Sequence, residues 1–263
     1  MIVKRPSELA IMLEAARINR EALEAIEPYI KPGATTAELN KIAEDAILSR
    51  GGRPAFKGYR HPQGGPSFPA TLCTSVNEVV VHGIPNNNPL KDGDILSIDV
   101  GTFYRGYAGD MAKTYAVGTP SSKAKRLLEV TERSLYAGIE QARVGKRVGD
   151  ISAAIEDVIR AAGYWAIREF VGHGIGVDFH ESPEVPNFGK RGEGPVLRPG
   201  LVLAIEPMVS EKRAEVKILR DGWTAPTRNR SLAAHFEHTV AITEEGPMIL
   251  TAKTVRPLEL VAA

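Results

Sequence analysis

The sequence predicts an α+β fold of two similar halves, each made of two helices followed by strands. Residues 33–51 are repeated at residues 145–163, with a constant offset of 112 residues. Each copy follows a longer amphipathic stretch, at residues 8–26 and 122–142, and precedes a region rich in strand-forming residues. Residues 97–115 form a predicted β-hairpin. An internal duplication explains these observations, and chance likeness between two capped helices is the alternative.

If the halves are duplicated, their helix pairs cover one face of two half-sheets, which join into one curved, mainly antiparallel sheet. We expect a single domain over residues 1–263, with halves at about residues 1–118 and 119–250, because no linker is long enough to separate domains. A site on the open face between the halves would then draw residues from both of them.

Composition and charge limit the partners of the chain. Of 263 residues, 43% are hydrophobic and 25% charged, as is typical of a globular protein. The net charge of +1 argues against nucleic acid or an anionic membrane as a partner. No run approaches the ~18 apolar residues of a membrane span. The single cysteine, Cys73, excludes an internal disulfide, and residues 1–20 lack a signal-peptide pattern, so we expect a cytoplasmic location.

The helices have recognisable starts and stops. Ser7 is the expected N-cap of the first helix, whose apolar residues recur at helical spacing as far as Ile26. Thr35 or Thr36 begins the second helix, which stops at Gly51-Gly52. The second pair of helices follows at the duplicated positions.

Strands and loops make up the rest. Glycine and proline predict a loop at residues 53–69 and another at residues 172–176, and they recur in residues 182–200. The expected strands lie around a turn at Asn77, at residues 201–205, and at residues 234–243, and the last of these includes Glu237. Residues 251–263 are expected as a tail.

The predicted hairpin brings two carboxylates together. If its strands pair symmetrically about Tyr104 and Arg105, Asp99 lies opposite Asp110, with Cβ atoms roughly 5 Å apart on one face. Facing carboxylates repel and raise each other's pKa unless a cation lies between them. One or two divalent cations are the simplest occupant. Ordinary turn or edge acids, or a different strand register, are the alternatives.

Further candidates come from other parts of the chain. His82, His173 and His180 lie beside glycine or in glycine-rich segments instead of on apolar stripes. Glu206 precedes Pro207 at the end of an apolar strand, where an unpaired carboxylate is costly to bury. Glu237 lies in the last expected strand. Taken singly, each residue has an ordinary explanation, as a hydrogen-bonded histidine, a surface acid or an outward-facing strand residue.

As a set, two Asp, two Glu and one His suit Mn, Fe, Co or Zn. Four carboxylates exceed the needs of one zinc ion. They suit two divalent ions about 3.5–4 Å apart, bridged by carboxylates and a water whose pKa falls toward neutrality. This arrangement is typical of hydrolases, and the remaining histidines would orient substrate and stabilise a developing oxyanion.

Seven short motifs carry these residues in order along the chain. They are His82-Gly83-Ile84-Pro85, Ile98-Asp99-Val100, Gly109-Asp110, Gly172-His173-Gly174-Ile175-Gly176, Phe179-His180-Glu181, Ile205-Glu206-Pro207-Met208 and Phe236-Glu237-His238-Thr239. Together they resemble the motifs of the type I methionine aminopeptidases, metallopeptidases of family M24, over nearly the whole chain. The resemblance implies the "pita-bread" fold and a cytoplasmic enzyme that removes the initiator methionine when the second residue is small.

The resemblance also implies roles for individual residues. Two divalent ions would be held by Asp99, Asp110, His173, Glu206 and Glu237. Asp110 and Glu237 would bridge the ions, and Glu206 would also carry a proton from water to the leaving amine. The implied partners are peptides with N-terminal methionine and nascent chains at the ribosome, without nucleic acid or membrane, and we expect a monomer.

Substrate contacts follow in the same way. His180 would bond the scissile carbonyl oxygen or the oxyanion, and His82 would contact the scissile amide nitrogen. The methionine amine would bind near the ion held by Asp99. The implied side-chain pocket consists of Tyr59, Phe68, Cys73, Phe179 and Trp223, because a thioether packs well against aromatic rings.

Two alternatives to this enzyme remain open. Prolidase and X-Pro aminopeptidase share the fold and ligands but usually carry an additional N-terminal domain. A non-catalytic protein on the same fold would be expected to have lost ligands, and none of the five is missing. The segment at residues 60–67 is longer and richer in glycine and proline than the family pattern, which puts the pocket roles of Tyr59 and Phe68 in doubt.

Overall fold

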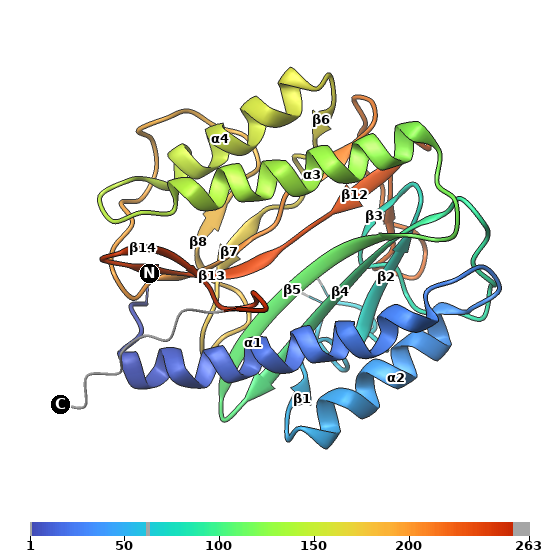
Figure 1. Ribbon diagram of the computed structural model, residues 1–263, viewed down its shortest axis with the longest axis horizontal. Coiled ribbons are helices and arrows are strands. Elements are labelled where there is room, and N and C mark those ends of the chain that lie inside the picture. The colour runs from blue at the N-terminus through green and yellow to red at the C-terminus, as the bar shows by residue number, and fades with distance from the viewer. Residues whose placement is uncertain (1, 62–63, 255–263) are drawn as a thin grey trace.

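The computed structural model describes residues 2–61 and 64–254. Two pairs of packed helices lie on opposite sides of a central set of strands (Figure 1). The first pair is α1 (Pro6–Ile26) with α2 (Thr36–Ser49), and the second is α3 (Ser122–Gln141) with α4 (Val148–Ala161). The short 3-10 helix η1 (Glu27–Tyr29) extends α1. The expected α+β class and both helix pairs are confirmed.

Local capping explains where the first two helices begin. Thr35 caps α2, and Glu38 accepts a hydrogen bond from the Thr35 amide at 2.9 Å, as predicted for this start. The prediction for α1 is wrong, because its N-cap is Arg5 and not Ser7. Pro6 presets the helical φ angle at the first position. Glu8 then accepts the Arg5 amide at 2.6 Å.

Within the described residues, the strands form four hydrogen-bonded sheets, and all the pairings between them are antiparallel. One sheet contains β1 (Arg53–Pro54), β2 (Leu72–Val76), β4 (Ile95–Tyr104) and β5 (Tyr107–Ala116). A second contains β7 (Gly172–Gly174), β8 (Glu181–Val185), β9 (Val202–Ile205), β13 (His238–Thr243) and β14 (Gly246–Ile249). The smaller sheets are β6 (Trp165–Ala166) with β10 (Met208–Ser210) and β12 (Ala233–His235), and β3 (Val79–Val81) with β11 (Ala225–Pro226).

The hairpin β4–β5 exists, but the predicted register is wrong by two residues. Asp110 pairs with Gly101, and Asp99 pairs with Ala112. The reason is the turn, in which Arg105 and Gly106 both have positive φ, at 46° and 85°. A two-residue turn of this kind pairs Tyr104 with Tyr107. Asp99 and Asp110 are therefore diagonal neighbours, still on the same face of the sheet.

Two further expectations about the strands are wrong. The expected strand at residues 234–243 is interrupted at Phe236–Glu237, so that β12 and β13 belong to different sheets. Glu237 is thus not within a strand, and its amide bonds Ala112 of β5 at 2.9 Å. The expected loop at residues 172–176 contains strand β7, where His173 pairs with Ala204. Residues 255–263 of the expected tail lie outside the described residues.

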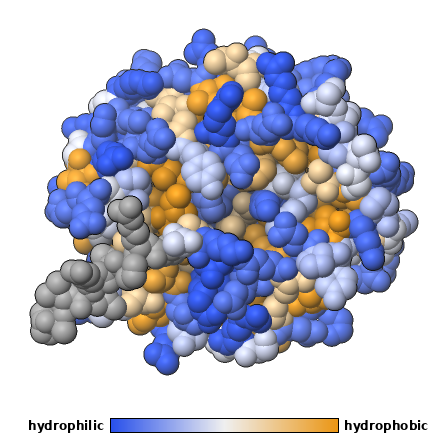
Figure 2. All heavy atoms as spheres, in the orientation of Figure 1, coloured by the Kyte–Doolittle hydropathy of each residue, from blue (hydrophilic) through white to orange (hydrophobic). Residues whose placement is uncertain are grey.

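Separate apolar clusters lie beneath the two helix pairs. Met111 and Ile98 pack with residues of α1 and α2, whereas Ile205 and Val240 pack with residues of α3 and α4. We propose that each helix pair, with the strands packed beneath it, forms one half of a duplicated domain, and that the halves lie at about residues 1–118 and 119–250. The face seen in Figure 2 is covered mostly by polar side chains, with apolar ones in separate patches. Among the described helices, none combines the length and apolar character that a membrane crossing requires.

Candidate metal centre and active site

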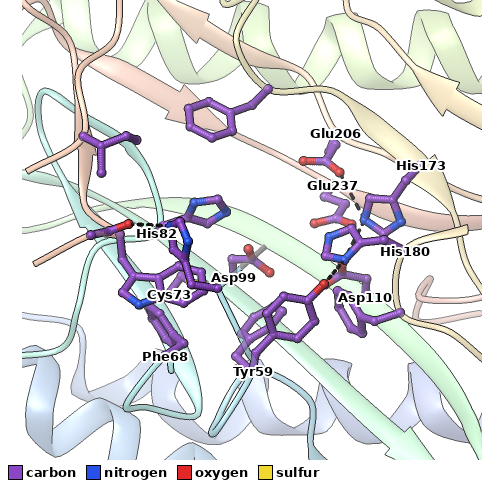
Figure 3. Close-up of a pocket in the computed structure, with 17 residues that line it drawn as sticks. Tyr59, Phe68, Cys73, His82, Asp99, Asp110, His173, His180, Glu206 and Glu237 are labelled. Atoms are coloured by element: carbon purple, nitrogen blue, oxygen red, sulfur yellow. Dashed lines mark hydrogen bonds and ion pairs between the residues drawn. The ribbon is translucent and has the colours of Figure 1, made fainter. Parts of the chain in front are cut away.

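One pocket, of about 470 Å³, is lined by every residue predicted for the site. The four carboxylates and His173 come from five separate places in the fold. Asp99 lies on β4, Asp110 on β5 and His173 on β7, while Glu206 follows β9 and Glu237 lies between β12 and β13. Figure 3 shows Asp110, His173, Glu206 and Glu237 gathered at one side of the pocket, with Asp99 nearby.

The distances within this group suit a shared cation. His173 Nε2 lies 3.7 Å from Asp110 Oδ2 and 3.5 Å from Glu206 Oε1. Asp110, His173 and Glu237 each offer a ligand atom within 4.8 Å of the others. Within residues 2–61 and 64–254, the buried atoms Asp99 Oδ1 and Glu237 Oε1 have no hydrogen-bond partner. Buried acceptors without donors are costly, and a cation would satisfy both.

Burial and mutual repulsion change the acidity of these groups. Burial, and then the neighbouring carboxylates, raise the pKa of Asp99, Asp110 and Glu206 well above their usual values. The pKa of Glu237 is raised for the same reasons. Burial lowers the pKa of His173 to about 3, so its imidazole is neutral and free to act as a ligand. Four clustered carboxylates and a neutral imidazole therefore fit divalent cations, which would restore the ionised carboxylates.

Backbone contacts between distant strands hold the carboxylates in place. The Thr239 hydroxyl accepts a hydrogen bond from the Asp110 amide at 2.9 Å and donates to the Asp110 carbonyl at 2.7 Å. Together with the bond from the Glu237 amide to Ala112, this contact joins β5 to the β12–β13 segment. The interrupted strand thus places Glu237 beside Asp110.

The two other predicted histidines also face the pocket, on opposite sides of Asp99 in the view of Figure 3. His82 has a positive φ of 60°, and its ring lies 5.2 Å from the Phe170 ring. Burial lowers its pKa to about 4. His180 is exposed, and its Nδ1 lies 2.7 Å from the Tyr59 hydroxyl. The rings of His180 and His173 are 4.3 Å apart, so His180 is next to the carboxylate group.

The predicted side-chain pocket is present as an apolar wall. Phe68, Cys73, Phe179 and Trp223 are buried, and Tyr59 is half-buried. The ring centroids of Phe68 and Trp223 are 5.3 Å apart. Trp223 Nε1 donates to the Pro66 carbonyl at 2.9 Å, which ties the glycine- and proline-rich segment to the wall. Residues 62 and 63 of that segment lie outside the described residues.

Sequence reasoning missed six residues of the site. Five line the pocket, namely Phe56, His61, Phe170, Ile218 and Gly222. The sixth, His235, lies behind the carboxylates, with Nε2 at 3.6 Å from Glu206 Oε2. Its position two residues before Glu237 was the available signal, because alternate residues of a strand share a face.

Comparison with known proteins identifies the family of the chain. The sequence profile of metallopeptidase family M24 matches residues 10–244. Methionine aminopeptidase 1 of Bacillus subtilis (strain 168) is 50% identical over 251 residues, covering 95% of this chain and 99% of that protein. Crystal structures of methionine aminopeptidases from Rickettsia prowazekii and Thermotoga maritima each match with a TM-score of 0.92, at 38% and 42% identity. Each match covers 96% of this chain and 100% of the other.

These matches confirm the resemblance and the pita-bread architecture that it implied. The family model extends over residues 10–244, which include all four carboxylates and His173. The chain therefore belongs to metallopeptidase family M24.

Proposed function

We propose that this protein is a type I methionine aminopeptidase that removes the N-terminal methionine from peptides and nascent chains when the second residue is small. The observation that carries the proposal is one pocket in which a carboxylate and histidine group adjoins an apolar aromatic wall. The first can hold cations for hydrolysis, and the second suits an unbranched thioether side chain.

The proposed cofactor is a pair of divalent ions, chosen from Co, Mn, Fe and Zn. Asp110 and Glu237 would help to hold both ions, Asp99 would help to hold one, and His173 with Glu206 would help to hold the other. Bound ions of this kind supply Lewis acidity, which lowers the pKa of water and polarises the scissile carbonyl. The number of carboxylates supports two ions, because one zinc ion takes four ligands in all.

The chain's own residues handle the protons and the developing charge. Glu206 accepts a proton from water and delivers it to the leaving amine. The Tyr59 hydroxyl, 2.7 Å from His180 Nδ1, can donate to that nitrogen when the ring proton is on Nε2. His180 Nε2–H then donates to the oxyanion, and His82 contacts the scissile amide nitrogen from across the pocket.

Recognition of methionine is assigned to the wall formed by Tyr59, Phe68, Cys73, Phe179 and Trp223. The free amine would bind near Asp99 and the ion that this residue would hold. We also predict that the protein is a monomer in the cytoplasm and that it acts on nascent chains at the ribosome. We predict no nucleic acid or membrane among its partners.

The test is a release assay on metal-stripped protein with Mn, Fe, Co or Zn added back singly. The substrates are Met-Ala-Ser and Ala-Pro-Ser. We expect methionine release from the first peptide to return with at least one ion, and no release from the second. Preferential cleavage of Ala-Pro-Ser would favour an X-Pro peptidase, and no cleavage of either peptide under any ion would overturn the proposal.

A further inference from the structure

His235 is a buried histidine that the proposed mechanism does not use. It ends strand β12, and its side chain is 2% exposed. Its Nε2 lies 3.6 Å from Glu206 Oε2 and 3.9 Å from Glu237 Oε2. Among the described residues, this buried nitrogen has no hydrogen-bond partner. His235 does not line the pocket, so it faces the two carboxylates from behind.

We propose that His235 is a positioning residue whose Nε2–H points at the Glu206 and Glu237 carboxylates and fixes their orientation toward the cations. A neutral imidazole has one N–H donor and one acceptor nitrogen. When Glu206 and Glu237 are ionised, as cation binding requires, their oxygens near Nε2 are acceptors, so the proton belongs on Nε2, where it reduces the cost of burying both partners.

Hydrogen bonds to two neighbouring strands, β5 and β10, hold the backbone of His235 at this distance from the carboxylates. Its amide donates to Thr114 Oγ1 at 2.9 Å, and the same hydroxyl donates to its carbonyl at 2.7 Å. His235 also pairs with Met208 of β10, two residues beyond Glu206. The Glu206 carbonyl accepts a hydrogen bond from Asn187 Nδ2 at 3.1 Å. The pairing of β10 with β12 therefore sets the separation of the imidazole from Glu206.

The inference rests on the proposed function, in which Glu206 and Glu237 are ligands. Groups that hydrogen-bond a metal ligand from outside orient it and raise its affinity for the metal, and their loss typically costs 10–100-fold in affinity. His235 lies behind the ligands instead of in the pocket, so it acts through Glu206 and Glu237 and does not touch substrate.

The first test measures Mn²⁺ affinity by calorimetric titration of metal-stripped protein. His235→Leu removes the donor, and we expect its affinity to fall by about 10–100-fold. His235→Gln keeps an N–H donor at similar reach and should retain most of the affinity. His238→Leu is the matched control, because His238 bonds Tyr136 and Thr251 instead of carboxylates. Unchanged affinity in His235→Leu, or an equal loss in His235→Gln, would overturn the inference.

The second test needs neither metal nor activity. Long-range ¹⁵N–¹H spectra of the metal-free wild-type protein, recorded at increasing pH so that the neighbouring carboxyl groups become ionised, report which ring nitrogen of His235 carries the proton. We expect the Nε2–H tautomer, and an Nδ1–H tautomer would refute the inference. If the wild-type protein bound no Mn²⁺, the proposed function would fail, while these spectra would still decide the role of His235. They also decide it if His235→Leu does not fold.

Discussion

Asp110 faces groups from several other strands, although it lies near the middle of β5. Its Oδ2 is 3.7 Å from His173 Nε2, and Glu237 is the charged neighbour that most raises its pKa. Asp110→Asn removes one charge and one bridging oxygen from the proposed dinuclear centre. We expect the number of tightly bound ions and the rate of methionine release to fall together, measured by calorimetric titration and peptide assay.

Glu237→Gln should behave as Asp110→Asn does, because both residues are proposed bridges. Asp45→Asn, at an exposed acid of α2, should leave both quantities unchanged. Two tight ions in either bridge variant would count against the bridging roles.

His180 and Tyr59 act as a pair at the exposed edge of the pocket. His180→Ala removes the proposed oxyanion donor, and loss of one such donor typically lowers kcat about 10²–10³-fold. Tyr59→Phe removes only the hydroxyl 2.7 Å from Nδ1 and should lower kcat by a smaller factor. Metal content, measured by atomic emission, should be unchanged in both variants. Full turnover in His180→Ala would exclude this role.

At the level of single residues, the sequence indicated the site residues that have unusual neighbours along the chain. Asp99, Asp110 and Glu206 stood out as acids within or beside apolar strands, and His173 stood out among glycines. His61 has no unusual neighbours along the chain, and His235 had only its position two residues before Glu237 as a signal, because the importance of both depends on what packs against them. His235 is placed by pairing with Met208, a contact between distant segments.

Elements defined by local interactions were predicted better than those defined by distant ones. The four helices follow from apolar spacing and nearby stops, all within a few residues. The interruption between β12 and β13 follows from the bond between the Glu237 amide and Ala112, 125 positions earlier in the chain. The hairpin register depends on the positive φ of Arg105, which an arginine in the sequence does not predict.

The N-terminal segment and the start of β8 are joined by a buried ion pair between Lys4 and Glu181. The side chains are 1% and 3% exposed. Glu181 Oε1 also accepts the Val177 amide at 2.9 Å, so the pair holds the segment that carries His180. Lys4→Met leaves the carboxylate buried and unpaired, and we expect the free energy of unfolding to fall by about 3–5 kcal/mol in urea titration.

The control for this prediction is Lys41→Met, whose pair with Asp45 is exposed and whose loss should hardly change stability. The double variant Lys4→Met/Glu181→Gln should be more stable than Lys4→Met, since no buried charge is left alone. A Lys4→Met protein as stable as the wild type would show that the pair contributes nothing.

At the scale of the whole molecule, the site gathers its charged groups where the two proposed halves meet. Asp99 and Asp110 come from the first half, and His173, Glu206 and Glu237 come from the second. The sequence could predict this convergence from the repeated helices, but the separations between the groups depend on four sheets and their cross-links. A consequence is that folding forces four carboxylates together, which affects the stability of the metal-free protein.

The direction of that effect depends on pH. Groups whose pKa is raised by folding keep protons that the unfolded chain has lost, so their stabilising effect disappears as pH rises. Asp99, Asp110, Glu206 and Glu237 all belong to this class. Buried histidines have the opposite effect, since the pKa of His82 falls to about 4 and that of His235 to about 3. The rise in stability that these histidines cause with increasing pH is complete once pH passes 6.5, the ordinary pKa of histidine.

Above pH 7, therefore, the carboxylates set the slope for the metal-free protein. We expect its free energy of unfolding to fall between pH 7 and 8, by up to about 1.4 kcal/mol for each proton that the folded state retains. The measurement is urea unfolding of metal-stripped protein at several pH values. In Asp110→Asn, stability should fall less steeply with pH, because the side-chain amide of the introduced asparagine does not titrate. Cations require ionised carboxylates, so the stability gained on adding Mn²⁺ should grow over the same range. A metal-free stability that rises from pH 7 to 8 would mean that the four carboxylates are not held together as the fold places them.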